Sequence, residues 1–328
     1  MSMRNPAKSS DPAKDAADGE VIGRGYFIGP HRIAARPLEP ALYVVATPIG
    51  NLGDITIRAL ETLAAAELVA CEDTRVTRVL MDRYGLKTPL VAYHDHNAEV
   101  ARPRLMAALA EGKAVALVSD AGTPLVSDPG YKLVTAAAEA GHRIVPIPGA
   151  SALLAGLVAA GLPTDCFLFV GFLSAREEAR RHRIEELASL AATLVFYESP
   201  HRLGETLAEL AAVMGPDRPA AVARELTKAF EEVVRGSLSE LAQRYADAKP
   251  KGEIVVLVGP APEMETSDVD ADRLLLAALQ RAAPGKAAAE VARLTGRNRK
   301  DLYERALALK PEGGVPPPRS PLSGRGRP

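Results

Sequence analysis

Residues 41–54, ALYVVATPIGNLGD, decide the fold of this 328-residue chain. Residues 41–46 are a short apolar run with β-branched side chains, which predicts a buried strand. A turn rich in glycine and proline follows, and Asp54 or Thr56 then caps a helix that continues to about Ala65. A buried strand, a tight loop and a helix form the first part of a unit that builds a parallel sheet.

The same alternation of apolar run and helix continues after this unit. We expect strands at 68–71, 90–92, 114–118 and 144–145, and helices at 76–81, 102–110 and 132–140. Because these strands are uniformly apolar rather than alternating, the sheet is expected to be parallel and covered on both faces. They form a first α/β lobe over residues 39–152. A very apolar helix, 151–160, leads out of it.

A second α/β lobe is expected over residues 153–262. Its strands lie near 167–170, 193–197, 220–224 and 254–258, and its helices near 176–187, 203–213 and 239–245. An additional strand at 230–235 has no helix between it and the strand before it. This pattern favours a mixed sheet.

The ends of the chain have a different composition. Residues 1–38 are rich in Pro, Ala, Gly and charge without periodicity, which predicts a disordered extension. Over 270–310, two helices, a turn at Thr295-Gly296 and a helix capped by Asn298 are typical of a helix-turn-helix, although a plain helical hairpin remains the alternative. Residues 311–328 are expected to be a disordered basic tail.

The charge of the chain is concentrated near its C-terminus. Residues 281–328 hold eleven Lys or Arg and four Asp or Glu, a net charge of +7, whereas the whole chain carries −1. This asymmetry predicts that attraction to a polyanion is confined to one appendage. A basic tail without a partner is the alternative interpretation.

Several classes of site are disfavoured. Cys71 and Cys166 have no ligand spacing for a metal and no disulfide pattern, and His94 and His96 fit a polar loop better than a metal site. No apolar run reaches the roughly 20 residues that cross a bilayer, and no secretory signal is present, so we expect a cytoplasmic protein. Neither a G-x-x-x-x-G-K-[ST] loop nor a G-x-G-x-x-G loop after a strand occurs, which disfavours ATP hydrolysis and NAD-linked hydride transfer.

Three loops at one edge of the first sheet are candidates for ligand binding. They cover residues 47–54, 119–130 and 146–152, each directly after an expected strand. Glycine permits close approach of the backbone to a ligand, and proline stiffens the loop in advance. In an open parallel sheet, ligands bind beyond the carboxyl ends of the strands. The second lobe adds the strand ends 196–202 and 224–228, where Glu198, Arg202 and Glu225 either contact a substrate or form salt bridges between the lobes.

These motifs resemble a known family. LYVVATPIGNLGDITIRAL, CEDTR, LVSDAGTPLVSDPG, PIPGASA, FYESPHR, RELTK and KGEIVVLV look like the ribosomal RNA small-subunit methyltransferase I group of the tetrapyrrole methylase superfamily, over about residues 40–310. The resemblance implies a two-lobed α/β tetrapyrrole-methylase-like fold and a homodimer. S-adenosylmethionine would lie between the lobes, and the reaction would be 2′-O-methylation of a decoding-centre cytidine in the 16S rRNA of the 30S subunit.

Two other functions stay open at this point. One is methylation of a tetrapyrrole by the same fold, and the other is RNA binding without catalysis, with the cleft used as a ligand sensor. Where tetrapyrrole methylases carry a shorter G-x-G-P-G-D loop, this chain has TPIGNLGD at residues 47–54. That departure favours RNA over a macrocycle.

The resemblance also implies site residues. The cofactor-binding candidates are Pro48, Gly50, Asn51, Asp120, Gly122, Thr123, Pro124, Leu125, Val126, Pro148, Gly149, Ala150, Ser151, Ala152, Tyr197, Arg224 and Ile254. Methyl transfer to a hydroxyl needs a base or a nearby cation, and the candidates are Glu198, Glu225 and Lys228, with His201 as a further possibility. The RNA-binding candidates are His201, Arg202, Arg293, Arg297, Arg299 and Lys300. No metal is expected.

Overall fold

The computed structural model describes residues 24–94, 96–127, 130–248, 250–262 and 268–309. These fall into two compact units, one over residues 1–261 and one over 262–328. The predictions made for residues 1–23 and 311–328 lie outside the described residues.

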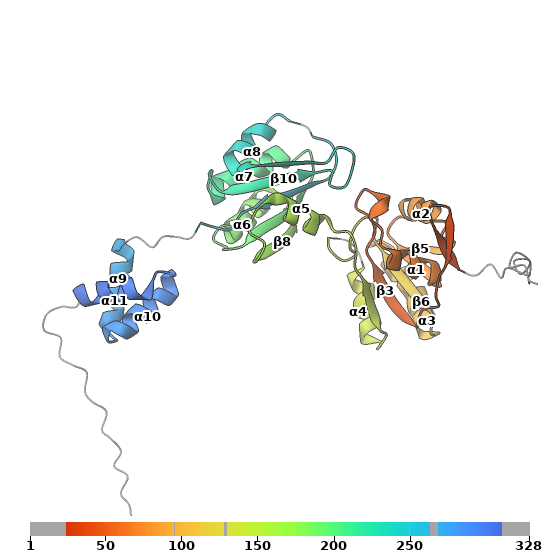
Figure 1. Ribbon diagram of the computed structural model, residues 1–328, viewed down its shortest axis with the longest axis horizontal. Coiled ribbons are helices and arrows are strands. Elements are labelled where there is room, and N and C mark those ends of the chain that lie inside the picture. The colour runs from red at the N-terminus through yellow and green to blue at the C-terminus, as the bar shows by residue number, and fades with distance from the viewer. Residues whose placement is uncertain (1–23, 95, 128–129, 249, 263–267, 310–328) are drawn as a thin grey trace, which may run out of the picture. The chain divides into compact units, whose positions relative to one another are not determined.

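The first lobe is built on a five-stranded parallel sheet, as the sequence predicts (Figure 1). The strand order is β5-β4-β6-β3-β7, and every neighbouring pair is parallel. The strands are β3 (Ala41–Val45), β4 (Leu68–Cys71), β5 (Leu90–Ala92), β6 (Ala114–Val118) and β7 (Ile144–Ile147). The helices are α1 (Ile57–Ala65), α2 (Thr74–Arg83), α3 (Ala98–Ala110) and α4 (Tyr131–Glu139), and a short 3-10 helix covers Leu52–Asp54.

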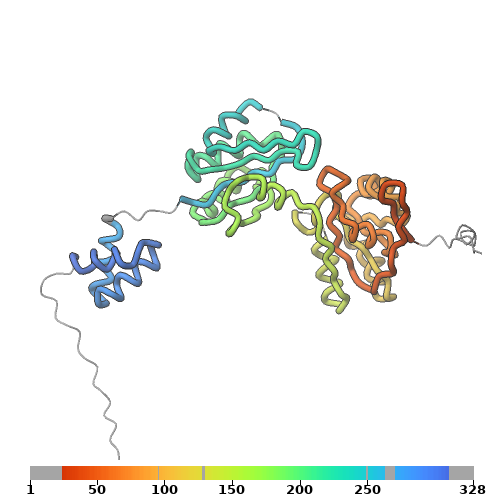
Figure 2. The backbone as a smooth tube through the Cα atoms, viewed as in Figure 1, coloured from red at the N-terminus to blue at the C-terminus, as the bar shows by residue number. Residues whose placement is uncertain are grey.

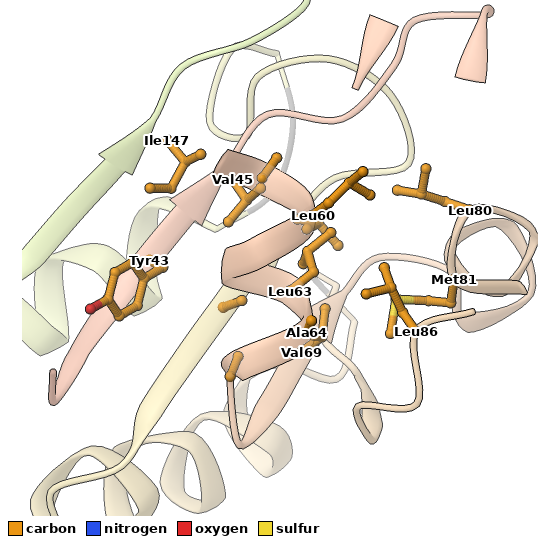
Figure 3. Packing of buried hydrophobic residues seen from close by; sticks show 14 of the residues in the cluster. Tyr43, Val45, Leu60, Leu63, Ala64, Val69, Leu80, Met81, Leu86 and Ile147 are labelled. Atoms are coloured by element: carbon orange, nitrogen blue, oxygen red, sulfur yellow. The ribbon is translucent and has the colours of Figure 1, made fainter. Parts of the chain in front are cut away.

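Helices cover both faces of this sheet because successive strand residues point to opposite sides. Tyr43 and Val45 of β3 pack against α1 and α2 on one face (Figure 3), whereas Leu42 packs against α3 and α4 on the other. Thr56 begins α1, since its side chain accepts a hydrogen bond from the Ala59 N–H. Of the two residues that the sequence offers as the cap of this helix, Asp54 and Thr56, the structure therefore uses Thr56.

The prediction of disorder over residues 1–38 was wrong for its described part. β1 (Gly25–Ile28) and β2 (His31–Ala34) form an antiparallel hairpin, and Tyr26 of β1 is buried in the core with α1. The Phe27 N–H donates to the Tyr84 carbonyl at 2.9 Å, which ties the hairpin to the lobe. This segment is therefore ordered by contacts with residues that lie far from it in the sequence. Its strands have only four residues each, which is too short for a recognisable hydrophobic pattern.

The second lobe, coloured green to cyan in Figure 2, contains a mixed five-stranded sheet in the order β11-β10-β12-β9-β8, which confirms the prediction. Only β8 and β9 pair in parallel. The strands are β8 (Phe167–Phe172), β9 (Thr193–Glu198), β10 (Pro219–Arg224), β11 (Glu232–Ser237) and β12 (Ile254–Val258). The helices are α5 (Ala152–Ala160), α6 (Glu177–Leu187), α7 (Leu203–Met214) and α8 (Leu238–Tyr245).

The two faces of the second sheet are covered differently. α6, α7 and α8 pack on one face, and α5 packs on the other. Ile49, from the loop after β3 in the first lobe, is buried in the same cluster as α5. The loop after β3 thus reaches the core of the second lobe.

The second compact unit is a three-helix module. α9 (Asp268–Leu279), α10 (Pro284–Thr295) and α11 (Arg299–Ala308) share a small core that includes Leu275, Val291 and Leu302. Gly296 adopts φ +71° after α10, and the Asn298 side chain accepts from the Lys300 N–H at 2.8 Å to cap α11. The predicted turn and cap are both confirmed.

Candidate active site

A cleft of about 320 Å³ opens where the loops of the two lobes meet. Pockets that hold small ligands are typically of this size or larger. The residues that line it are Ile49, Ala121, Gly122, Thr123, Val126, Ser127, Ser151 and Ala152 before β8, and Phe172, Tyr197, Glu198, Ser199, Pro200, Leu226, Gly252, Glu253, Ile254 and Val255 from β8 onward. The cleft therefore lies beyond the carboxyl ends of the first-lobe strands, where the sequence places it.

The three first-lobe loops are joined to one another at this edge. Thr47 and Gly122 exchange backbone hydrogen bonds of 2.8 and 3.1 Å, and the Thr123 hydroxyl donates to the Ala150 carbonyl at 3.2 Å. Gly122 has φ +80°, a conformation that favours glycine, and a Cβ there would lie 3.3 Å from Ile49. These contacts join the three loops into one wall of the cleft.

Backbone strain is concentrated beside the cleft. Leu125 and Ser127 adopt φ of +76° and +63°, and Glu225 and Thr227 adopt +52° and +68°. These are the only non-glycine residues with positive φ in the described part of the chain. Residues with side chains rarely occupy this region, and such strain tends to gather at functional sites.

The second-lobe wall is aromatic where β8 and β9 end. The Tyr197 hydroxyl accepts from the Leu153 N–H at 3.2 Å, so this side chain joins β9 to the start of α5. Its ring lies edge-on to Phe169 and Phe172, with centroid separations of 4.9 and 5.6 Å.

Glu198 is a buried carboxylate in the cleft wall. Only 3% of the residue is exposed, its Oε1 accepts from the Ser199 N–H at 2.7 Å, and its Oε2 accepts from the Thr206 hydroxyl at 2.6 Å. The Arg202 guanidinium lies 3.5 Å from Oε2 and also donates to two backbone carbonyls of residues 173–174. The carboxylate is thereby fixed in one orientation.

Glu225 and Lys228 form an ion pair beside the cleft rather than in it. Lys228 Nζ contacts Glu225 at 2.7 Å and Glu253 at 3.0 Å, and only Glu253 of these three lines the cleft. The hydrogen bond from Lys228 lowers the pKa of Glu225. Burial acts to lower the pKa of Lys228, but its hydrogen bonds to Glu225 and Glu253 outweigh burial and raise it. Lys228 is therefore a cation at neutral pH.

The Lys228 side chain also joins the two lobes. A Cβ on Gly50 would lie 2.5 Å from Lys228 Cγ, so the aliphatic part of Lys228 lies against the backbone of the loop that follows β3. A Cβ on Gly252 would lie 2.2 Å from the Glu225 carboxyl group. Glycine at 50 and 252 therefore leaves room for this ion pair.

The candidate cofactor residues divide into two groups. Those that line the cleft are Gly122, Thr123, Val126, Ser151, Ala152, Tyr197 and Ile254. Those in the same or neighbouring loops that are not part of the lining are Pro48, Gly50, Asn51, Asp120, Pro124, Leu125, Pro148, Gly149, Ala150 and Arg224. Asp120 accepts from the Asp73 N–H at 2.9 Å and so joins two loops, whereas Asn51 accepts from the Gly53 N–H and caps the 3-10 helix of its own loop. Arg224 pairs with Glu232.

The RNA-binding candidates lie on both units. His201 is exposed at the start of α7, and Arg202 is half-buried against Glu198. In the helical module, Arg293, Arg299 and Lys300 are exposed, and Arg297 is partly buried.

Several lining residues were missed from the sequence. Ser199, Pro200, Leu226, Gly252 and Glu253 belong to motifs that the sequence already singles out, so proximity in those motifs was the available signal. Phe172 carries no such signal, because it reads as the end of an apolar strand.

Metal ligands and membrane spans are not apparent in the described residues. That part of the chain holds no group of three or more His, Cys, Asp or Glu side chains arranged to bind a metal ion. It also contains no helix with the length and apolar character needed to cross a bilayer.

Comparison with known proteins identifies the family. The model for tetrapyrrole (corrin/porphyrin) methylases matches residues 41–242, and that for the RsmI C-terminal HTH domain matches 265–310. The ribosomal RNA small subunit methyltransferase I of Mesorhizobium japonicum is 58% identical over 88% of this chain and 98% of its own length. This chain belongs to the ribosomal RNA small subunit methyltransferase I family. The protein of the same name from Erythrobacter litoralis is 52% identical, over 85% of this chain and 99% of its own.

A solved structure shows the same fold at greater distance. The cobalt precorrin-4 methyltransferase of cobalamin biosynthesis is 19% identical and matches with a TM-score of 0.52, over 66% of this chain and 94% of that one. Family and fold thus confirm the resemblance stated from the motifs, and they confirm the helix-turn-helix assignment for the C-terminal module.

Proposed function

We propose that this chain transfers the methyl group of S-adenosylmethionine to the ribose 2′-hydroxyl of a decoding-centre cytidine in 16S rRNA, as part of the 30S subunit. Its family membership supports the broader statement that it is an S-adenosylmethionine-dependent methyltransferase of small-subunit rRNA. The observation that carries the proposal is that the family's motif loops from both lobes converge on one cleft.

The cleft fits the proposed cofactor in size and chemistry. Its volume of about 320 Å³ suits a small ligand, and Gly122 adds no side chain to its lining. Hydroxyls of Thr123 and Ser151 and the apolar side chain of Ile254 supply the mixture of polar and apolar contacts that a nucleoside with a charged tail requires. S-adenosylmethionine supplies a methyl group on a sulfonium that is itself a good leaving group.

The protein's remaining task is to align and deprotonate the ribose hydroxyl. Of Glu198, Glu225 and Lys228, only Glu198 lines the cleft. Its Oε1 has one partner, the Ser199 N–H, and therefore has capacity for a second hydrogen bond, whereas Oε2 lies against both Thr206 and Arg202. We therefore propose Glu198 as the general base, and we propose that Glu225 and Lys228 position the turn that carries Leu226.

The proposed RNA contacts are mainly electrostatic. Arg293, Arg297, Arg299 and Lys300 give the helical module a basic character suited to phosphates, and His201 and Arg202 lie in the loop that contributes Ser199 to the cleft. From the family resemblance we also propose that the protein forms a homodimer and acts in the cytoplasm. Light scattering of the purified protein tests the dimer.

Labelled donor tests the function directly. Wild-type protein is incubated with 30S subunits, with 50S subunits and with a tetrapyrrole precursor, and a truncated chain that ends at residue 261 is assayed in parallel. We expect label only in the 30S RNA, and weaker, less salt-sensitive binding by the truncated chain. Methylation of the macrocycle by both chains would instead establish the tetrapyrrole alternative. Donor binding without transfer to any of these would favour a regulator.

A further inference from the structure

An irregularity in β8 presents an aromatic side chain at the cleft. Strand β8 pairs with β9 in register from Phe167 to Phe169, and the register then shifts so that Gly171 faces Phe196. One additional residue in β8 is therefore accommodated as a β-bulge, and Gly171 adopts φ +74° there. Bulges of this kind commonly redirect a side chain next to an active site.

The bulge changes which face of the sheet Phe172 occupies. In a regular strand, residues three apart point to opposite faces, so Phe169 and Phe172 would be separated by the sheet. Instead both rings pack edge-on against Tyr197, at centroid separations of 4.9 and 5.6 Å. Phe172 consequently lines the cleft, at the end of a row of three aromatic rings.

The first lobe restricts the bulge from the other side. A Cβ on Gly171 would lie 3.1 Å from Ser127 Oγ, and Ser127 is itself strained at φ +63°. Two constrained backbones from different lobes therefore meet beside Phe172. This arrangement constrains the backbone that carries Phe172, and 59% of the residue is exposed.

An exposed ring on a constrained backbone suits a ligand that arrives from solvent. Other apolar residues of the cleft, such as Ile254 and Leu226, are almost completely buried, so they form its floor. RNA nucleotides that are recognised individually are splayed out of their stack, and their bases then stack on aromatic side chains.

We propose that Phe172 is a stacking platform for the base of the target nucleotide, so that its ribose reaches the transferred methyl group. This inference rests on the proposed function, because it assumes an RNA substrate. The adenine of the donor is also a flat ring that could stack on Phe172, and the experiment distinguishes the RNA base from this adenine.

The chain contains no tryptophan, so Phe172→Trp places its single tryptophan at the platform, where it can be excited selectively over the eight tyrosines. We expect its emission to be quenched by an RNA fragment of the decoding region or by 30S subunits, and to be unchanged by S-adenosylmethionine. Phe167→Trp is the matched control, because Phe167 lies on the same strand, is 42% exposed and does not line the cleft. Its emission should respond to neither ligand.

Kinetics give the second readout. Phe172→Ala should lower kcat/KM for 30S subunits about ten- to a hundred-fold, as expected for one lost base-stacking contact, with an unchanged Kd for the donor. Phe172→Trp should retain most of the activity, and Phe167→Ala all of it. A weakened donor Kd, quenching by the donor, or a Phe172→Ala variant equal to wild type overturns the proposal. Wild-type protein that fails to methylate 30S subunits would instead refute the proposed function itself.

Discussion

Replacement of Glu198 by glutamine tests the proposed chemistry most sharply, because it removes the charge and keeps the shape. The carboxylate accepts hydrogen bonds from Ser199 and Thr206 and lies beside Arg202. Glutamine keeps one oxygen acceptor but replaces the other with an NH2 donor, so one of the two hydrogen bonds becomes neutral and the other, at the Thr206 hydroxyl, reverses its direction. We expect a loss of about 1–2 kcal/mol in the free energy of unfolding, measured by urea denaturation.

The effect on catalysis should be far larger than this loss of stability. A general base typically contributes a factor of about 10² to 10⁴, so single-turnover methyl transfer by Glu198→Gln should fall within that range. Thr206→Val is the matched control: it removes one hydrogen bond to the same carboxylate, costs about 1–3 kcal/mol in stability and leaves the charge. Its transfer rate should fall by less than about tenfold.

Two results would refute this reasoning. One is a transfer rate for Glu198→Gln within about tenfold of wild type at a temperature where both proteins are folded. The other is an equal loss of rate in Thr206→Val, which would make Glu198 a structural residue whose disturbance matters only through folding.

Three further predictions concern the support of the site and the fold. Because the pKa of Glu225 is lowered in the folded state, its ionised carboxylate stabilises the fold at pH values above about 4.5, and this stabilisation is lost as the pH falls below that value. Lys228→Met should therefore make the unfolding free energy fall less steeply between neutral and acid pH. An unchanged pH profile contradicts the ion pair. Gly252→Ala should lower the unfolding free energy by about 2–4 kcal/mol, because φ is +97° and Glu225 occupies the space of the new Cβ. The control Gly215→Ala, at φ +104° with no neighbour within 4 Å of the new Cβ, should lower it by only about 1–2 kcal/mol. Equal losses in the two variants would exclude the clash with Glu225. Tyr26→Ala should lower the unfolding free energy by about 3 kcal/mol, and no change would place the hairpin outside the core.

The features that the sequence predicts well are those carried by local pattern. Apolar runs such as residues 114–118, set between helical patterns, predict strands of a covered sheet, and Asn298 caps its helix through atoms two residues away. The three glycine- and proline-rich loops follow from the same logic. Adjacent parallel strands place their carboxyl ends together, so the loops had to meet at one edge.

The features that the sequence does not reveal depend on distant contacts. Tyr26 is ordered by a core formed later in the chain, and no local period marks its hairpin. The direction of Phe172 depends on one additional residue in β8, which reverses the face that alternation would give it. Glu225 and Lys228 have the residue types of a catalytic pair, but packing against Gly50 and Gly252 places them behind the cleft wall.

The most direct test of the central claim is the chemical identity of the methylated nucleoside. RNA from 30S subunits treated with wild-type protein and labelled donor is digested completely, and the products are separated by chromatography with mass spectrometry. The account predicts label in 2′-O-methylcytidine from a single decoding-centre position. Label on a base atom, at scattered positions, or nowhere in the RNA would contradict it.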